Sequence, residues 1–257
     1  TLQDTIMCKN KKSLYPIFCL FIFLPCIQPF IKAEDFESPE IVCNRAHGKI
    51  IVDGWLNEPA WKNAEKIDFV RIISFEKPDM ETKAFCLYDD EYLYIGFIMY
   101  DMDIWGIYEK RDSLLYDEDV VEVFLKPNLS KDPYYEFEVS PRNIVLDAYL
   151  GNRTLAGNMF LRFAKWNCPG LKTAVKVKGT LNNWEDIDEY WSVEIAIPFR
   201  SLPSLKKAPL PDDIWLINLG RYDYSIYQKN INEVTTCSPI TKFDFHRYEE
   251  WRFIRYK

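Results

Sequence analysis

The stretch Tyr116-Asp117-Glu118-Asp119-Val120-Val121-Glu122-Val123-Phe124-Leu125-Lys126-Pro127 decides the fold of this chain. Its apolar side chains include Val121, Val123 and Leu125 at every second position, and Glu122 falls on the alternate set. A period of two is typical of a half-buried β-strand. The stretch therefore predicts a strand with one face on a core and a carboxylate on the other.

A second stretch, Tyr134-Tyr135-Glu136-Phe137-Glu138-Val139-Ser140-Pro141, repeats this alternation shortly afterwards. Phe137 and Val139 form its apolar set, and Glu136 and Glu138 form its acidic set. The two strands together predict a sheet face that carries carboxylates and tyrosines away from the core. Such a face can hold a polar ligand rich in hydroxyl groups, because carboxylates accept hydrogen bonds and aromatic rings offer flat apolar surface.

Short strand patterns continue along the chain, and none of the segments between them predicts a long amphipathic helix. We expect strands at 49–53, 82–88, 92–100, 119–126, 134–140, 144–149, 159–166, 173–178, 190–197, 214–221 and 251–256. Asp89-Asp90-Glu91 separates two of them and predicts a hairpin turn. Many short strands with turn signals between them predict an all-β fold, an antiparallel β-sandwich.

The N-terminal segment has the features of a signal peptide. Met7 is a plausible start preceded by read-through, lysines follow within 9–12, and 17–24 is apolar. This pattern predicts that 1–33 is a secretory signal peptide with upstream read-through. The alternative is an uncleaved membrane anchor, but a spanning helix needs about 20 apolar residues. We therefore expect no membrane span after signal removal.

The rest of the chain, 34–257, is predicted to form one domain, because no linker interrupts the strand patterns. Apolar residues make up 48% of the 257 residues, which is ample for a sizeable core. The formal net charge of −7 argues against a nucleic-acid partner, since phosphate binding needs clustered Lys and Arg. A signal peptide predicts export to the periplasm, the cell surface or the extracellular space.

Six motifs carry a resemblance to a known family, and they follow one another in the family's order. They are Ile51-Val52-Asp53-Gly54-Trp55-Leu56-Asn57-Glu58-Pro59-Ala60-Trp61, the two stretches quoted above, Trp191-Ser192-Val193-Glu194-Ile195-Ala196-Ile197-Pro198, Trp215-Leu216-Ile217-Asn218-Leu219-Gly220-Arg221 and Cys237-Ser238-Pro239. The chain resembles the family 9 carbohydrate-binding module and its relatives, over nearly all of the segment after the predicted signal peptide. The resemblance implies a distorted β-sandwich, jelly-roll-like or immunoglobulin-like, and an exported, non-catalytic module that binds a saccharide in a polysaccharide-use system.

The resemblance also implies site residues. A pyranose has apolar C–H faces for aromatic rings and a hydroxyl rim for charged groups. In the family, an aromatic residue stands before the acidic strand, and the glutamate of that strand binds hydroxyls; here these positions are Tyr116 and Glu122. A second aromatic residue is expected before Ser238-Pro239, but Cys237 stands there and cannot stack on a ring. This departure puts the second half of the aromatic clamp in doubt.

Other residues of the motif regions complete the candidate site. Trp105, Tyr149 or Tyr224 can substitute for the second aromatic residue, and Arg111 lies within the resembling region. Glu138 lies on the acidic face of its predicted strand. The candidate carbohydrate-binding residues are Tyr116, Glu122, Trp105, Arg111 and Glu138.

Two alternative functions remain open from the residues. Glu136 and Glu138, two apart on one strand, would lie about 6.5–7 Å apart, a separation that suits an inverting glycoside hydrolase. A haem-binding, cytochrome-like sandwich would need axial ligands such as Met99 or Met159 with His246, although no haem attachment motif is present.

Metal and cysteine chemistry give weaker signals. Calcium occurs in the family that the chain resembles, and the turns Asp89-Asp90-Glu91 and Asp101-Met102-Asp103 carry oxygen ligands, so a structural calcium ion is a possible cofactor without a defined site. Four cysteines follow residue 33 without a C-x-x-C spacing, which leaves disulfides and buried thiols equally open. Arg221 closes an apolar strand and is expected to form a structural ion pair.

Overall fold

The computed structural model describes residues 39–131, 133–151, 165–205, 207–228 and 232–257. The predicted signal peptide, 1–33, and most of the strand expected at 159–166 lie outside these residues. In the part of the chain that is described, no helix is both long and apolar enough to cross a membrane.

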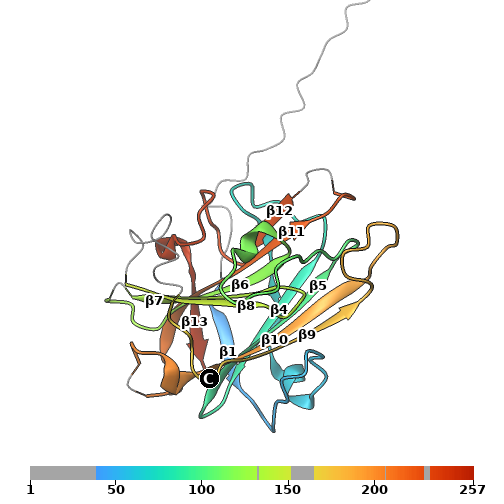
Figure 1. The fold of residues 1–257 in the computed structure, drawn as a ribbon. Coiled ribbons are helices and arrows are strands. Elements are labelled where there is room, and N and C mark those ends of the chain that lie inside the picture. The colour runs from blue at the N-terminus through green and yellow to red at the C-terminus, as the bar shows by residue number, and fades with distance from the viewer. Residues whose placement is uncertain (1–38, 132, 152–164, 206, 229–231) are drawn as a thin grey trace, which may run out of the picture. The chain divides into compact units, whose positions relative to one another are not determined.

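Nearly all regular structure consists of strands, which form one continuous hydrogen-bonded path (Figure 1). Its first half runs through β8 (Val145–Leu150), β7 (Tyr134–Val139), β6 (Val120–Lys126), β11 (Ile214–Tyr224), β13 (Arg252–Tyr256) and β1 (Ile41–Arg45). Its second half runs from β1 through β4 (Thr82–Tyr88), β5 (Tyr92–Tyr100), β10 (Tyr190–Pro198) and β9 (Lys172–Lys178). Short strands β2 (Ile67–Asp68), β3 (Val70–Arg71) and β12 (Asn232–Thr236) add to the edges, and the described helices are single 3₁₀ turns: η2 (Pro59–Asn63), η3 (Leu115–Asp117), η5 (Phe199–Ser201) and η6 (Tyr248–Glu250).

Strand β1 joins the two halves. Its residues Ile41 to Cys43 pair in parallel with β13, and Asn44 and Arg45 pair in parallel with β4. All other described strand pairs are antiparallel. The predicted all-β sandwich is confirmed, with β1 as the one described strand that departs from antiparallel pairing.

The strand expected at 49–53 is wrong. This segment has no strand pairing; instead the backbone N–H groups of Asp53 and Gly54 donate to the Glu194 carboxylate, each at 2.8 Å. Ile50 packs in a separate small apolar cluster with Trp61. Local alternation of apolar residues is present there, but a buried carboxylate satisfies the backbone groups that a neighbouring strand would otherwise pair.

The main core lies between the two halves of the sheet. Val123 of β6 and Phe137 of β7 pack in one buried cluster with Ile95 of β5 and Val193 of β10. The alternation in the two quoted stretches therefore predicted the inner face correctly. The glutamates of the alternate set lie on the outer face.

The outer face of β6, β7 and β8 is covered by a second apolar cluster rather than by solvent alone. Phe124 of β6 packs edge-on against Phe245 at 5.9 Å between ring centroids and against Trp251 at 5.5 Å. Leu115 of η3 and Leu146 of β8 belong to the same cluster. Segments from two distant parts of the sequence thus form a layer over the acidic face.

Candidate functional site

Three glutamates meet on the outer face of the sheet: Glu122 of β6 with Glu136 and Glu138 of β7. Glu122 lies opposite Glu138 across the strand pair, and opposite Gly220 on the β11 side. The three side chains, here called the glutamate triad, are buried, and one carboxylate oxygen from each lies within 4.8 Å of the others. The strand pattern predicted their common face; it did not predict their burial.

The triad is electrostatically unbalanced. No salt bridge from any residue that the structure describes reaches these carboxylates, and the Oε2 atoms of Glu136 and Glu138 have no hydrogen-bond partner. Desolvation raises the pKa of Glu122 to about 8. Burial, followed by repulsion between the acids, also raises the pKa values of Glu136 and Glu138 well above the usual range. Without a cation, the group favours protonated carboxyls at neutral pH.

Two tyrosines border the triad. Tyr116 lies in η3 with 37% of its surface exposed, and Tyr222 lies on β11 opposite Val120. Burial raises the pKa of both phenols, and the charges of Glu136 and Glu138 raise them further, which places both tyrosines near the triad. Tyr224 donates its hydroxyl to the Tyr116 carbonyl at 2.7 Å and so anchors η3. An exposed ring thus stands beside buried hydrogen-bonding groups.

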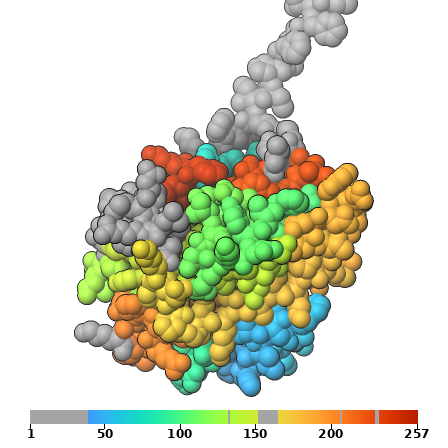
Figure 2. All heavy atoms as spheres, in the orientation of Figure 1, coloured from blue at the N-terminus to red at the C-terminus, as the bar shows by residue number. Residues whose placement is uncertain are grey.

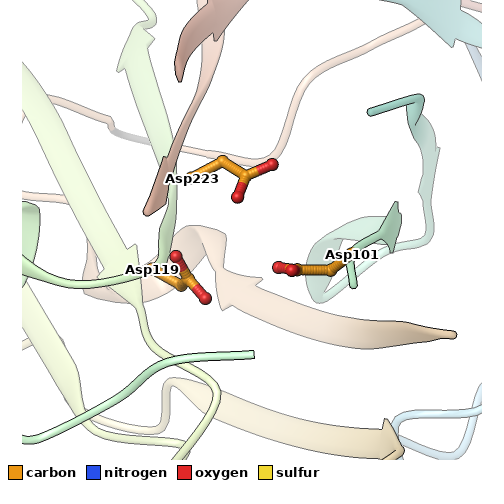
Figure 3. A group of neighbouring side chains, drawn as sticks. All are labelled: Asp101, Asp119 and Asp223. Atoms are coloured by element: carbon orange, nitrogen blue, oxygen red, sulfur yellow. The ribbon is translucent and has the colours of Figure 1, made fainter. Parts of the chain in front are cut away.

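The segment between β5 and β6, which carries Tyr116, lies on the visible face of the molecule in green (Figure 2). A second acidic cluster anchors it: Asp101 after β5, Asp119 before β6 and Asp223 in β11 direct their carboxylates toward one another (Figure 3). Arg221 pairs with two of them, through Nη2 at 2.9 Å from Asp101 and 2.8 Å from Asp223. The predicted structural ion pair of Arg221 is confirmed.

Asp119 links this cluster to the site. Its Oδ2 accepts the backbone N–H of Trp105 at 2.6 Å, and its Oδ1 accepts that of Tyr224 at 2.7 Å. Burial raises the pKa of Asp119 well above its usual range and that of Asp223 to about 7, while the Arg221 charge opposes the shift of Asp223. Through these hydrogen bonds Asp119 holds Trp105 and Tyr224 in place. The aspartate cluster therefore stabilises the segment that carries Tyr116, and it is not itself part of the glutamate triad.

The structure brings only part of the predicted residue set together. Glu122 and Glu138 are neighbours, and Tyr116 borders them. Trp105 is half-buried and is held through its backbone; within the described residues, no ring contact or hydrogen bond joins it to the triad. Arg111 binds Asp147 at 2.6 Å. Asp147 lies opposite Phe137 and so belongs to the core side of β8, away from the triad.

Cys237 does not occupy a clamp position. Its side chain is fully buried in the main core, its N–H donates to the Leu219 carbonyl at 2.9 Å, and its sulfur accepts the Leu219 N–H at 3.2 Å. An aromatic residue at this position would enter the core rather than face Tyr116. Cys237, which was not expected to stack on a ring, therefore lies in the core and not at the outer sheet face.

The residues proposed as haem ligands are separated by the sheet. Met99 is buried in the main core, whereas His246 lies over the outer face, with Nδ1 2.9 Å from the Tyr134 hydroxyl and its ring against Phe124. Met159 lies outside the described residues. Met99 and His246 cannot share one iron atom in this fold.

Tyr222 and Gly220 were missed as site residues. Gly220 and Tyr222 are two residues apart on β11, so they share the face of the sheet that Glu122 occupies in β6. Pairing the two sequence motifs in register would have indicated this. Gly220 has a packing reason: a Cβ there would lie 2.6 Å from Cε2 of Phe245. Glycine thus lets the covering segment approach the sheet beside Glu122.

The two acidic turns predicted as calcium ligands are already engaged. Asp89 Oδ1 accepts the N–H groups of Glu91 and Tyr92, and its Oδ2 accepts the Tyr94 hydroxyl. Asp101 accepts the Asp103 N–H and binds Arg221. These hydrogen bonds stabilise the turns themselves, and a structural calcium ion stays a prediction. All four described cysteines are buried free thiols.

The chain thus forms an all-β sandwich that carries an exposed tyrosine and three buried glutamates. The family model described as "Carbohydrate family 9 binding domain-like" matches residues 52–210, more than half of the chain. The chain belongs to this family, as the motif order predicted.

One relative in sequence and two solved structures are similar to this chain. Endo-1,4-beta-xylanase A from Thermotoga maritima is 25% identical over 202 residues, which cover 77% of this chain but only 16% of the xylanase. A solved structure of a Bacteroides uniformis protein has a TM-score of 0.63 at 13% identity and covers 86% of this chain and all of that one. A family 9 carbohydrate-binding module from Caldicellulosiruptor kristjanssonii, in complex with cellotriose, has a TM-score of 0.57 at 19% identity over 85% of this chain and 94% of that one. At these identities the two structures show a common fold.

Proposed function

We propose that this chain is a non-catalytic carbohydrate-binding module that takes a saccharide at the outer sheet face beside Tyr116 and Glu122. Its family membership supports the ligand class, and the similar module that was solved with cellotriose supports a glucan-like saccharide. The observation that carries the location is the exposed ring of Tyr116 in η3, whose carbonyl accepts the Tyr224 hydroxyl beside the β11–β6 pair that carries Glu122.

The chemistry of this face suits a sugar. The Tyr116 ring offers a flat apolar surface to the C–H groups of a pyranose, and carboxyl oxygens of the triad accept its hydroxyls. A hydrogen bond between neutral groups contributes about 0.5–1.5 kcal/mol, so the loss of one glutamate should lower the affinity several-fold. Desolvation at the triad strengthens these bonds further, since water competes less there.

Binding fits the site better than hydrolysis. A glycoside hydrolase divides the work between a protonated acid and an ionised carboxylate, which requires environments that push the two pKa values apart. Burial raises the pKa values of both Glu136 and Glu138, and the hydrogen bond between them lowers that of Glu136 and raises that of Glu138. Membership of a family of binding domains, rather than the pKa values, favours binding over hydrolysis.

The cellular setting is part of the proposal. The N-terminal sequence supports export, and the similarity to a segment of a xylanase supports a role in polysaccharide use. We propose that the protein acts outside the cytoplasm, in the periplasm, at the cell surface or in the medium, and presents a saccharide to partner enzymes.

A glycan array with the purified full chain tests the function. Binding to one or more oligosaccharides is the expected result, and incubation with the same glycans should release no reducing sugar. Reducing-sugar release that Glu136→Gln abolishes would assign the site to a hydrolase instead. An array without any bound glycan would contradict the proposal.

A further inference from the structure

Two exposed aromatic rings lie on loops next to the segment that carries Tyr116. Trp184, between β9 and β10, is 60% exposed, and Tyr227, after β11, is 41% exposed. The Tyr227 hydroxyl donates to the Trp184 carbonyl at 3.0 Å, so the two loops are in contact. Ile187 and Ile226, close to these rings in sequence, are also exposed. Single exposed apolar side chains are common, but a contiguous group of them marks an interaction surface. These four residues are called the tryptophan platform.

Hydrogen bonds hold the loop that carries Trp184 in place. The buried Asp188 carboxylate accepts the backbone N–H of Ile104 at 2.8 Å. Asn182 binds the backbone of Gly106 twice: its Oδ1 accepts the Gly106 N–H, and its Nδ2 donates to the Gly106 carbonyl, each at 2.7 Å. A ring on a loop that is already ordered loses little conformational freedom when a ligand binds. The platform is therefore preorganised for stacking.

The platform adjoins the proposed saccharide site. The segment between β5 and β6 makes the bonds to the Trp184 loop, and its far end carries Tyr116; Figure 2 shows this segment in green beside the orange surface of β9, β10 and their connection. On the other side, the Tyr224 hydroxyl donates to the Tyr116 carbonyl. Tyr227 follows three residues later, so the Cα atoms of Tyr224 and Tyr227 lie at most about 11 Å apart. Tyr116 and Trp184 therefore contact the same short stretch of chain.

We propose that the tryptophan platform binds further units of the saccharide that stacks on Tyr116, so that the ligand is an extended chain of several sugars. This step rests on the proposed function. The rings of Trp184 and Tyr227 offer flat apolar surface to C–H faces, and Asn183 and Glu185, on either side of Trp184, expose an amide and a carboxylate for hydroxyl groups. The cores of protein–protein interfaces are instead depleted of charged residues. The chemistry of the platform thus favours a saccharide over a second copy of the chain.

Calorimetric titration of the full chain with cellobiose and with cellohexaose tests the platform. The wild type should bind cellohexaose more tightly, because only the longer chain reaches both sets of rings. Trp184→Ala should lower the ratio of the two affinities by about tenfold, and Trp184→Phe, which keeps a ring, should retain most of it. Trp55→Ala is the matched control, because Trp55 is also exposed but lies in the segment before η2. Since Trp184 is exposed, the Tm of Trp184→Ala should stay within about 2 °C of the wild type.

The outcomes separate this inference from the proposed function. Equal wild-type affinities for cellobiose and cellohexaose would overturn the platform and leave saccharide binding at Tyr116 in place. A ratio that Trp184→Ala leaves unchanged would do the same. A concentration-dependent dimer, measured by light scattering, that Trp184→Ala abolishes would assign the platform to self-association instead. Absence of binding by both probes would contradict the glucan-like ligand of the proposed function, and this inference with it.

Discussion

Glu122 of β6 lies directly opposite Glu138 of β7, and the two buried side chains share the outer face of the sheet with Glu136. Like charges opposite each other on neighbouring strands are destabilising, and burial increases their cost. A protein that keeps three such groups in one place gives up stability there. Such departures from favourable packing are found mainly at functional sites, which agrees with a ligand site at this face.

Replacing Glu122 tests this relationship. Glu122→Gln replaces a carboxyl oxygen that accepts a ligand hydroxyl by an amide nitrogen that cannot accept one, so saccharide affinity should fall by about two- to tenfold. Because burial already favours the protonated form, which Gln resembles, Tm at pH 7 should stay the same or rise. Isothermal titration calorimetry and a melting curve measure the two effects. Unchanged affinity would place the ligand elsewhere.

The buried position of Cys237 makes a second prediction. Cys237→Trp forces a large ring into the main core, where overpacking costs about 1–3 kcal/mol or more. The free energy of unfolding in urea should fall, and saccharide affinity should not rise. Tighter binding by this variant would show that residue 237 does face the ligand after all.

Breaking the Arg221 ion pairs should destabilise the protein strongly. Arg221→Met leaves Asp101 and Asp223 buried without their partner and removes the bonds to Thr82 and the Tyr100 carbonyl. Breaking a buried pair in this way costs about 3–5 kcal/mol. Urea unfolding measures the loss, and adding Asp101→Asn should recover part of it. A loss below about 1 kcal/mol would contradict the structural role of the pair.

Glu250 predicts a stability change in acid. Burial alone would raise its pKa, but hydrogen bonds from Arg247 and Thr241 lower it to about 2. A carboxylate with a depressed folded pKa stabilises the protein above its unfolded pKa of about 4.5, and this contribution is lost as the pH falls toward 2. Glu250→Gln should therefore have a lower Tm than the wild type at pH 7, and the difference in Tm between the two proteins should become smaller at pH 2–3. A difference in Tm that stays constant from pH 7 to pH 2 would rule out this linkage.

The sequence allowed the faces of the central strands to be predicted, because alternation at Val121, Val123 and Leu125 fixes which side enters the core. It did not allow the burial of Glu122 to be predicted, since Phe245 and Trp251, which pack over Phe124, come from the far end of the chain. Contacts between distant segments leave no periodic signal.

The placement of Arg111 follows the same logic. Its position within the resembling motifs gave no information on which side of β8 its partner Asp147 lies.

Strand β1 was missed because its five residues, Ile41–Arg45, pair with two different strands and show only a short alternation. Motif order identified the family, while the exact composition of the site depended on three-dimensional register.

The central claim is that a saccharide stacks on Tyr116 beside the triad, and calorimetric titration of one variant tests it most directly. Tyr116→Ala should weaken binding of the array-selected saccharide by about ten- to hundredfold, and Tyr116→Phe, which keeps the ring, should bind nearly as well as the wild type. Tyr100→Ala is the matched control, because Tyr100 is also exposed but lies at the end of β5, in the other half of the sheet. Wild-type affinity in Tyr116→Ala, with an unchanged melting curve, would contradict the account.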